Sequence, residues 1–165
     1  MSAPSSTGTL EKTMSSESTR TTEPSLLVIF GGTGDLARRK LLPSLAHLYT
    51  TGKVHPDSRI VGVATNPNNT EEGYRELVGE ALAVAGVATT GLRERVHYQG
   101  LGQGDPEHFA ALRERLEALE REHGLTPRRA FYLALPTNAL PRTVDGLAEA
   151  GLNRDQPGGW SRLVI

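Results

Sequence analysis

The 165-residue chain has no cysteine, no long apolar run and no excess of charge of one sign. Without cysteine it cannot form disulfides, zinc ribbons or iron–sulfur clusters, and it has no thiol nucleophile. Its 18 basic residues stand against 19 acidic ones, so the basic face of a nucleic-acid-binding protein is not indicated. Apolar runs reach no more than about six residues, whereas a membrane-spanning helix needs about 20. We therefore expect one modest soluble domain, with neither nucleic acid nor membrane as a partner.

The first part of the chain, residues 1–24, is rich in Ser and Thr and has Leu10 as its only large aliphatic residue. Such a segment cannot bury enough apolar surface to offset the entropy of ordering, so we predict a disordered tail there. It lacks the apolar central region of a secretory signal and is too acidic for a transit peptide. We therefore expect a cytoplasmic protein whose single folded domain spans residues 25–165.

From Ser25 onward, short apolar runs alternate with longer segments of helical spacing, which is typical of βαβ units and a parallel sheet. Strands are predicted at residues 26–30, 59–64, 96–98, 130–135 and 162–165. Helices are predicted at residues 105–124, from about 70 to 82, and over roughly 138–150. The helix at 105–124 has the clearest signals, with Asp105 as N-cap, Pro106 at the first helical position and Gly124 as its end. The pattern as a whole predicts an α/β fold.

The turn after the first predicted strand contains the most informative motif of the chain. Gly31, Gly34 and Ala37 follow that strand at the spacing of a dinucleotide-binding βαβ unit. In such a unit the first glycine permits a tight turn, the second lets the backbone approach a pyrophosphate, and the third small residue permits close helix–strand packing. Backbone N–H groups at the helix start then face the phosphate charge. An ordinary glycine turn can have the same spacing, so the order of strand, turn and helix is what favours nucleotide binding.

The helix predicted after this turn begins with Arg38, Arg39 and Lys40. These side chains form either a solvated basic face or contacts to a cofactor phosphate or substrate, and their spacing leaves both interpretations open. Pro43 lies in the same helical segment, where it removes a backbone hydrogen bond and clashes with the carbonyl of Arg39. We therefore predict a kink at this point.

The segment Gly31-Gly-Thr-Gly-Asp-Leu-Ala-Arg-Arg-Lys-Leu-Leu-Pro43 closely resembles the opening of glucose-6-phosphate dehydrogenases. The resemblance continues through residues 60–64, 97–107, 131–136 and 159–165. It implies a Rossmann-type, doubly wound parallel sheet that binds NADP, joined in the complete enzyme to a larger domain for the sugar phosphate. The activity it implies is oxidation of glucose 6-phosphate to 6-phosphogluconolactone in the oxidative pentose phosphate pathway.

The same resemblance implies a set of cofactor-binding residues: Gly31, Gly32, Thr33, Gly34, Asp35, Leu36, Ala37, Arg38, Lys40, Thr65 and Asn66. The family usually has, after the second strand, an Arg that binds the 2′-phosphate of NADP, and Thr65 and Asn66 occupy that place here. Neither side chain is a charged fork, and neither is the acidic residue that holds a free ribose 2′-OH in NAD enzymes. NADP is therefore the expected cofactor, with NAD still possible. Thr137 and Leu140 also replace a proline and a cofactor-contacting tyrosine of many members.

In the family, the last matched strand runs into a Glu-Lys-Pro-Phe-Gly motif, and the substrate-phosphate site and a catalytic His–Asp pair follow. The chain ends before these features, so no catalytic residue is assigned. We expect an incomplete, cofactor-binding part of the enzyme that is inactive alone, with homo-oligomers expected only for the complete enzyme. The chain's histidines lack metal-ligand spacing, so no metal site is predicted and each is interpreted as structural or surface: His47, His55, His97, His108 and His123.

Two alternatives remain. The first is a free-standing NADP-binding module without catalysis. The second is a small reductase of the short-chain type, which needs a Tyr-x-x-x-Lys pair; Tyr49 and Lys53 have that spacing but lie at the end of the first predicted helix. An in-frame Glu-Lys-Pro-Phe-Gly continuation of the gene would favour the dehydrogenase over both.

Overall fold

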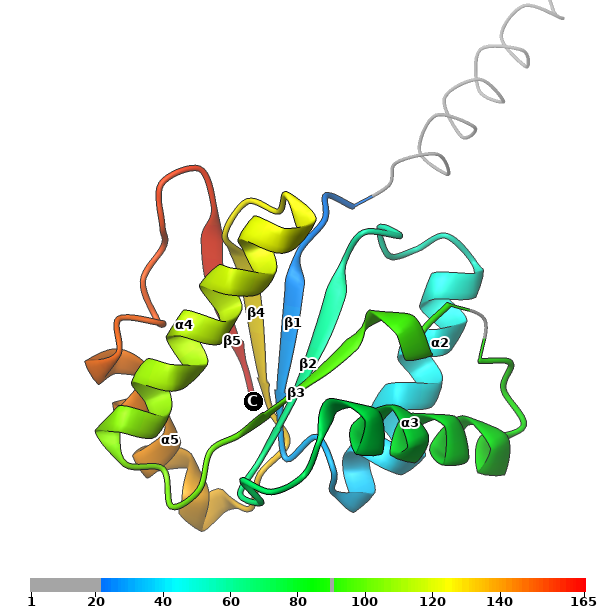
Figure 1. The fold of residues 1–165 in the computed structure, drawn as a ribbon, viewed down its shortest axis with the longest axis horizontal. Helices are drawn as coiled ribbons and strands as arrows, with labels where there is room; N and C mark the ends of the chain where they lie inside the picture. The colour runs from blue at the N-terminus through cyan, green and yellow to red at the C-terminus, as the bar shows by residue number, and fades with distance from the viewer. Residues whose placement is uncertain (1–21, 90) are drawn as a thin grey trace, which may run out of the picture.

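The structure is a computed structural model that describes residues 22–89 and 91–165. Most of the predicted tail, residues 1–21, lies outside the described residues. The strands are β1 (Leu26–Phe30), β2 (Arg59–Ala64), β3 (Val96–Gly100), β4 (Arg128–Leu133) and β5 (Trp160–Val164). All neighbouring pairs are parallel, and the order across the sheet is β3-β2-β1-β4-β5 (Figure 1). The chain thus winds outward from β1 in both directions.

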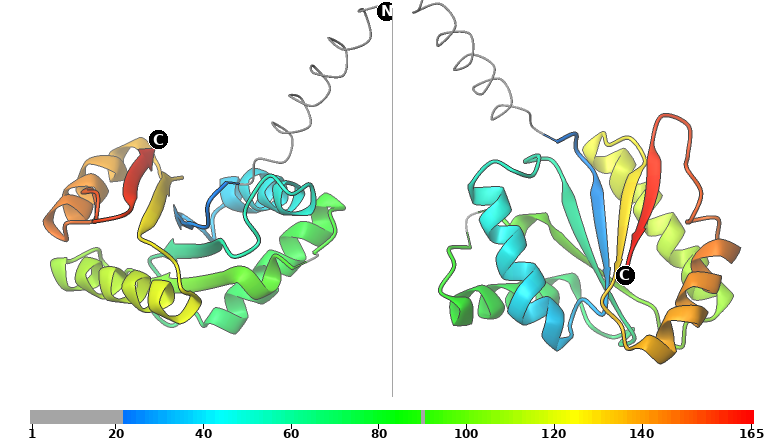
Figure 2. Two further views of the ribbon diagram at one scale, coloured as in Figure 1. Left: turned by 90° about the horizontal axis from the view of Figure 1, so that it is seen from above. Right: turned by 180° about the vertical axis from the view of Figure 1, so that it is seen from behind.

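The connections between the strands contain the helical segments η1 (Ala37–Leu41), α2 (Leu42–Thr50), α3 (Glu71–Ala85), η2 (Arg93–Arg95), α4 (Pro106–His123), η3 (Thr137–Ala139) and α5 (Leu140–Glu149). They cover both faces of the sheet (Figure 2). Side chains of α2 and α3 form one buried cluster with the sheet, and side chains of α4 and α5 form the other. This arrangement is the doubly wound, Rossmann-type α/β fold, which confirms the predicted fold class.

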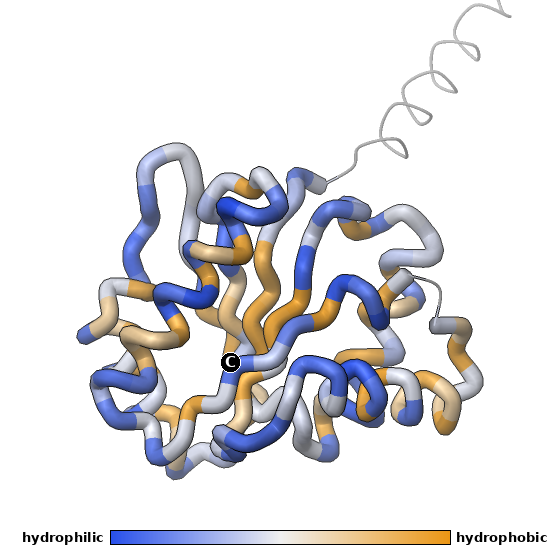
Figure 3. Tube along the Cα trace, in the orientation of Figure 1, coloured by the Kyte–Doolittle hydropathy of each residue, from blue (hydrophilic) through white to orange (hydrophobic). Residues whose placement is uncertain are grey.

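Burial of the sheet on both faces explains the apolar runs of the sequence. In β1, Val28 packs in the cluster with α4 and α5, whereas its neighbour Ile29 packs in the cluster with α2 and α3. Both are fully buried, as expected for a central parallel strand. Figure 3 shows the same trend, with the apolar positions gathered along the inner strands. No helix within the described ranges is both long and apolar enough to cross a membrane.

The predicted element types are confirmed, and the differences lie at their ends. β1 and β2 have the predicted bounds. β3 continues two residues beyond the predicted end, because Gly100 still pairs with Ala64. β4 and β5 each begin two residues earlier than predicted, because Arg128 pairs with Trp160 across the sheet. α4 has Asp105 as N-cap and Gly124 in the left-handed conformation at its end, as predicted. The helix predicted near 138–150 begins instead as a short 3₁₀ turn, η3, before α5.

Where a kink was predicted, at Pro43, the structure has a wide helical turn just before the proline. Residues 37–41 are π-helical, and the Leu42 N–H donates to the carbonyl of Ala37, five residues back. Pro43 then occupies the first turn of α2, where the missing N–H does no harm. A π turn of this kind lets the chain re-pair its carbonyls where proline interrupts the regular pattern.

A polar cluster ties α3 and α4 to the edge strand β3. His97 of β3 is buried, and its Nδ1 lies 2.9 Å from Oε1 of Glu71 on α3. Arg115 of α4 donates to the same carboxylate oxygen at 2.7 Å. Burial lowers the pKa of His97 despite its hydrogen bond to Glu71. Burial would raise the pKa of Glu71, but the hydrogen bond from His97 and the charges of Arg115 and Arg75 lower it.

Candidate functional site

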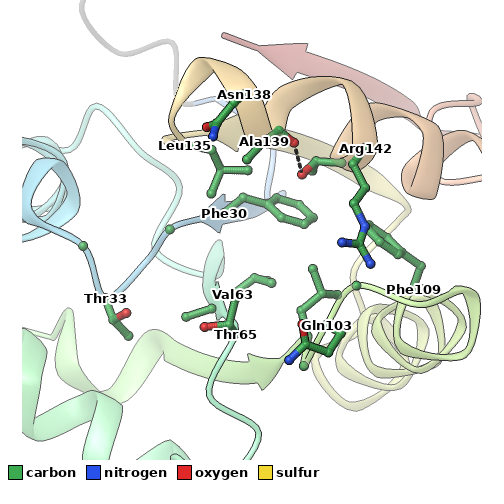
Figure 4. Close-up of a pocket in the computed structure, with 17 residues that line it drawn as sticks. Phe30, Thr33, Val63, Thr65, Gln103, Phe109, Leu135, Asn138, Ala139 and Arg142 are labelled. Atoms are coloured by element: carbon green, nitrogen blue, oxygen red, sulfur yellow. Dashed lines mark hydrogen bonds between the residues drawn. The ribbon is translucent and has the colours of Figure 1, made fainter.

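A pocket of about 490 Å³ lies beyond the carboxyl ends of the inner strands (Figure 4). Open α/β sheets bind ligands in this place, where the strand order reverses. The volume falls within the usual range of small-ligand sites. The described lining residues come from the turn after β1, the ends of β2 and β4, the loop after β3, and the helices α4, η3 and α5: Phe30, Gly31, Thr33, Gly34, Val63, Ala64, Thr65, Leu101, Gly102, Gln103, Gly104, Phe109, Leu135, Asn138, Ala139, Arg142 and Thr143.

The turn after β1 is held in place by its backbone. The N–H groups of Gly31 and Gly32 both donate to the carbonyl of Val63 on β2, at 2.9 and 3.1 Å. Gly31 has a φ of +79°, and a Cβ there would lie 2.4 Å from the carbonyl oxygen of Ala134, after β4. Only glycine fits this position, because both the backbone conformation and the neighbouring backbone exclude a side chain.

Gly32 is the buried residue of the turn and is held by a buried tyrosine. A Cβ on Gly32 would lie 2.8 Å from the Cα of Gly62 on β2. The hydroxyl of Tyr74, on α3, donates to the Gly32 carbonyl at 3.2 Å. Burial raises the pKa of Tyr74 well above its usual value, so this hydroxyl remains a proton donor at neutral pH. Gly32 therefore supports the turn from below and does not line the pocket.

Gly34 differs from the two glycines before it. It is exposed, lines the pocket and has an ordinary φ, and a Cβ there would meet only the carbonyl oxygen of Gly31, at 3.2 Å. Thr33 lines the pocket beside it (Figure 4). Ala37, three residues further on, is fully buried against the sheet. The structure thus places Gly31 in a tight turn, Gly34 where the backbone is open to the pocket, and Ala37 at the contact between helix and sheet.

The charged residues after the turn do not line the pocket. Arg38 donates from Nε to the carbonyl of Thr33 at 2.9 Å, which braces the turn. Arg39 pairs with Asp35 at 3.0 Å on the exposed surface. Together with part of α3, Asp35, Arg38 and Arg39 line a separate depression. Leu36 and Lys40 are exposed and belong to neither lining. The structure therefore does not gather these predicted residues with Gly31 and Gly34.

The two residues after β2 are also separated in their roles. Thr65 is exposed and lines the pocket. Asn66 does not line it, and instead organises the β2–α3 loop: its Oδ1 accepts from the Asn68 N–H at 3.0 Å, and its carbonyl accepts from the Tyr98 hydroxyl at 2.6 Å. Of this pair, Thr65 is the one placed to contact a ligand in the pocket.

The far side of the pocket was missed by reasoning from the sequence. Gln103 follows β3, and Asn138, Arg142 and Thr143 follow β4. Since the carboxyl ends of all parallel strands meet at one edge, the loops after β3 and β4 were predictable as walls. The sequence does not predict which side chains of those loops and helices point into the pocket.

The lining is nearly free of groups that could move a proton. Among the described lining residues there is no His, Lys, Asp or Glu, and Arg142 is the only charged one. A guanidinium does not deprotonate in proteins, so it cannot act as a general base. Within the described part of the chain, no group of three or more His, Asp or Glu side chains could hold a metal ion. The pocket can bind and orient a ligand, and its described residues offer no acid–base chemistry.

Comparison with known proteins agrees with this geometry. The family model "Glucose-6-phosphate dehydrogenase, NAD binding domain" matches residues 28–165. Glucose-6-phosphate 1-dehydrogenase 2 of Mycobacterium tuberculosis is 35% identical over 151 residues, which cover 86% of this chain and 29% of that protein. An Arabidopsis thaliana protein named inactive glucose-6-phosphate 1-dehydrogenase 4, chloroplastic, is 31% identical over 84% of this chain and 22% of its own length.

A solved structure of a glucose-6-phosphate dehydrogenase in complex with its substrate glucose-6-phosphate superposes with a TM-score of 0.74. It is 29% identical in sequence, and the match covers 87% of this chain and 30% of that one. The chain thus spans less than a third of the length of these relatives. The family match over residues 28–165 shows that the chain belongs to the family of the NAD-binding domain of glucose-6-phosphate dehydrogenases.

Proposed function

We propose that the chain is the nicotinamide-dinucleotide-binding part of a glucose-6-phosphate dehydrogenase. The observation that carries this proposal is Gly34, which leaves the turn after β1 open toward a pocket at the strand-order reversal. A pyrophosphate there would meet the N–H groups at the start of the following helix. The cofactor-binding residues are proposed to be Gly31, Gly32, Thr33, Gly34, Asp35, Leu36, Ala37, Arg38, Lys40, Thr65 and Asn66, in a folded domain of residues 25–165.

Within this set, the residues divide by role. Thr33, Gly34 and Thr65 line the pocket and are proposed to contact the cofactor. Gly31 also lines it, but its proposed role, with Gly32 and Ala37, is to shape the turn. Asp35, Leu36, Arg38, Lys40 and Asn66 do not line the pocket, so in this proposal they act through the turn and the neighbouring loop. NADP is the proposed cofactor, with NAD as the alternative.

The proposed reaction is hydride transfer from C1 of glucose 6-phosphate to the nicotinamide, which leaves a lactone. This step needs a base within hydrogen-bond reach of the C1 hydroxyl. The described pocket lining offers none, so we propose that the 165-residue chain binds cofactor and does not oxidise glucose 6-phosphate by itself. Its sugar-phosphate partner, homo-oligomerisation and cytoplasmic location belong to the complete enzyme and remain predictions.

The test is calorimetric titration of the chain with NADP and with NAD, repeated on Gly34→Val. A valine at position 34 would occupy the approach to the turn, so NADP binding should weaken by roughly a hundredfold or more. Gly79→Val is the matched control, because a Cβ on Gly79 of α3 meets only the side chain of Arg93, at 3.5 Å or more. Unchanged affinity in Gly34→Val would contradict the proposed pyrophosphate site.

A second candidate is a dinucleotide-binding module without catalysis. It is favoured by the Arabidopsis relative, whose name marks it as inactive. Activity of the product of the whole gene separates the two: reduction of NADP by glucose 6-phosphate supports the dehydrogenase, and cofactor binding without turnover supports the module.

A further inference from the structure

Among the described side chains on the far side of the pocket, none of which the proposed cofactor site uses, one is charged. Arg142 lies on α5, two thirds of its side chain is exposed, and its guanidinium extends over the pocket (Figure 4). Its Nε lies 3.9 Å from where a Cβ on Gly104 would be, in the loop after β3. The side chain therefore extends from α5, which follows β4, toward the loop after β3.

Arg142 carries the one charge among the pocket-lining residues in the described part of the chain. The place where an arginine was expected, after β2, holds the neutral Thr65. Arg38 and Arg39, which were the other candidates for a phosphate contact, bind the Thr33 carbonyl and Asp35 on the opposite side of the turn. An anionic group held in the pocket would therefore meet one fixed positive charge among the described lining residues, that of Arg142.

The two ends of the pocket suggest which anionic group this is. In dinucleotide-binding folds the adenosine ribose lies at the end of β2, where its 2′ position is read, and Thr65 stands there. Val63, Leu101 and Phe109 line the same pocket, and their apolar side chains suit a nucleobase. A phosphate on the 2′ position of a nucleotide in this pocket would find no charge at Thr65, and the cation of the described lining that it could recruit is Arg142.

Resting on the proposed cofactor site, we propose that Arg142 is the residue that selects NADP over NAD, by binding the 2′-phosphate from α5. It is a specificity-determining residue, and it replaces a charge that the end of β2 lacks. Arg142 can act in this way because a guanidinium forms paired hydrogen bonds with phosphate oxygens.

The present partner of Arg142 does not prevent this role. Its Nη2 lies 3.7 Å from Oδ1 of Asp105, the N-cap of α4, and both side chains are about half exposed or more. Exposed ion pairs of this length contribute little to stability, so a phosphate can displace the carboxylate at low cost. Asp105 is then a competitor, and its neutralisation should strengthen NADP binding.

The experiment titrates the wild-type chain and three variants with NADP and NAD at two salt concentrations. Arg142→Gln should weaken NADP binding about five- to tenfold and leave NAD binding within about twofold, because only the 2′-phosphate contact is lost. Arg142→Lys should retain part of the preference. Asp105→Asn, which keeps an N-cap residue, should strengthen NADP binding about two- to threefold without changing NAD binding.

Arg121→Gln, at an exposed arginine of α4 outside the pocket lining, is the matched control and should change neither affinity. Higher salt should reduce the NADP preference of the wild type and have no such effect in Arg142→Gln. Equal loss of NADP and NAD affinity in Arg142→Gln would overturn the proposal, since the contact would then be to the pyrophosphate or the base. No change in either affinity would overturn it as well. The titration of the wild-type chain tests the proposed function separately: if this chain binds neither cofactor, the proposed function itself is wrong.

Discussion

The turn after β1 and the first turns of α5 lie on opposite sides of the pocket and are held by different constraints (Figure 4). In the turn, Gly31 and Gly32 have no room for a Cβ, and their N–H groups are tied to β2. On α5, Arg142 is largely exposed and has one ion pair of 3.7 Å. The rigid glycine turn suits the pyrophosphate, which NADP and NAD share. The exposed Arg142 suits the 2′-phosphate, which only NADP has.

The largest expected effect comes from filling the rigid side. Gly31→Val should lower the free energy of unfolding by about 2 kcal/mol or more, because a β-branched residue is strained at positive φ and would clash with the Ala134 carbonyl. Urea unfolding followed by circular dichroism measures this change. Gly34→Val, three residues away, should alter the same free energy much less. Equal destabilisation by the two substitutions would remove the distinction between a shaping and a contacting glycine.

The next effect restores a charge to the neutral end of the pocket. The wild-type chain should prefer NADP to NAD by no more than about tenfold. Thr65→Arg should increase this preference by a further factor of about five to ten, because a charge-assisted contact to phosphate is added. Titrations with NADP and NAD at matched ionic strength give the ratio. If the wild-type chain already prefers NADP by several hundredfold and Thr65→Arg does not change this, the end of β2 does not limit binding of the 2′-phosphate.

A smaller effect should follow from removing the support beneath the turn. Tyr74→Phe deletes the hydroxyl that donates to the Gly32 carbonyl and should lower the free energy of unfolding by about 1 kcal/mol. The ring still fills the space beside Gly62, so the fold should persist. Thermal or urea unfolding measures the change, and an unchanged stability would mean that the hydroxyl does not hold the turn.

The smallest effect concerns the polar cluster that joins both helical layers through β3. The pKa of His97 in the folded chain lies below its ordinary value of 6.5. The contribution of neutral His97 to the free energy of unfolding is therefore complete above pH 6.5, and it is lost as the pH falls toward the folded pKa. Glu71, with a pKa below 4.5, extends the loss to lower pH. Acid should therefore destabilise the fold.

Urea unfolding at pH 7.5 and 5.5 measures this dependence. His97→Gln should reduce the difference in stability between the two pH values, because glutamine does not titrate. His47→Gln, at an exposed histidine of α2, is the control and should leave the difference unchanged. An undiminished difference in His97→Gln would assign the acid sensitivity to other groups.

Features that depend on the local sequence could be predicted, whereas features that depend on pairing across the sheet could not. Gly31 and Gly124 adopt positive-φ conformations that glycine permits, and Asp105 caps α4 with its side chain, so the turn and the ends of α4 were predictable locally. The bounds of β4 and β5 depend on pairing across the sheet, and they were misplaced by about two residues. Fold class was accessible because alternating strands and helices leave few parallel arrangements.

The candidate site was predictable on one side only. The resemblance predicts Arg38 and Lys40 as cofactor-binding residues, and this stays a prediction: Arg38 donates to the Thr33 carbonyl, Lys40 is exposed, and neither lines the pocket. Arg142 lies more than a hundred residues from the glycine turn, and it enters the pocket only because β4 is placed beside β1. Such a contact depends on tertiary structure and leaves no local signal.

The most direct test of the central claim is a ¹⁵N–¹H NMR titration of the chain with NADP. The predicted result is that amide shifts concentrate on Thr33, Gly34 and the residues around Thr65 and Arg142, at the carboxyl edge of the sheet. The opposite edge has a second pocket, lined by residues such as Tyr49, Lys53 and Trp160, which should be unaffected. Shifts centred on that second pocket, with Gly34 unmoved, would contradict the account.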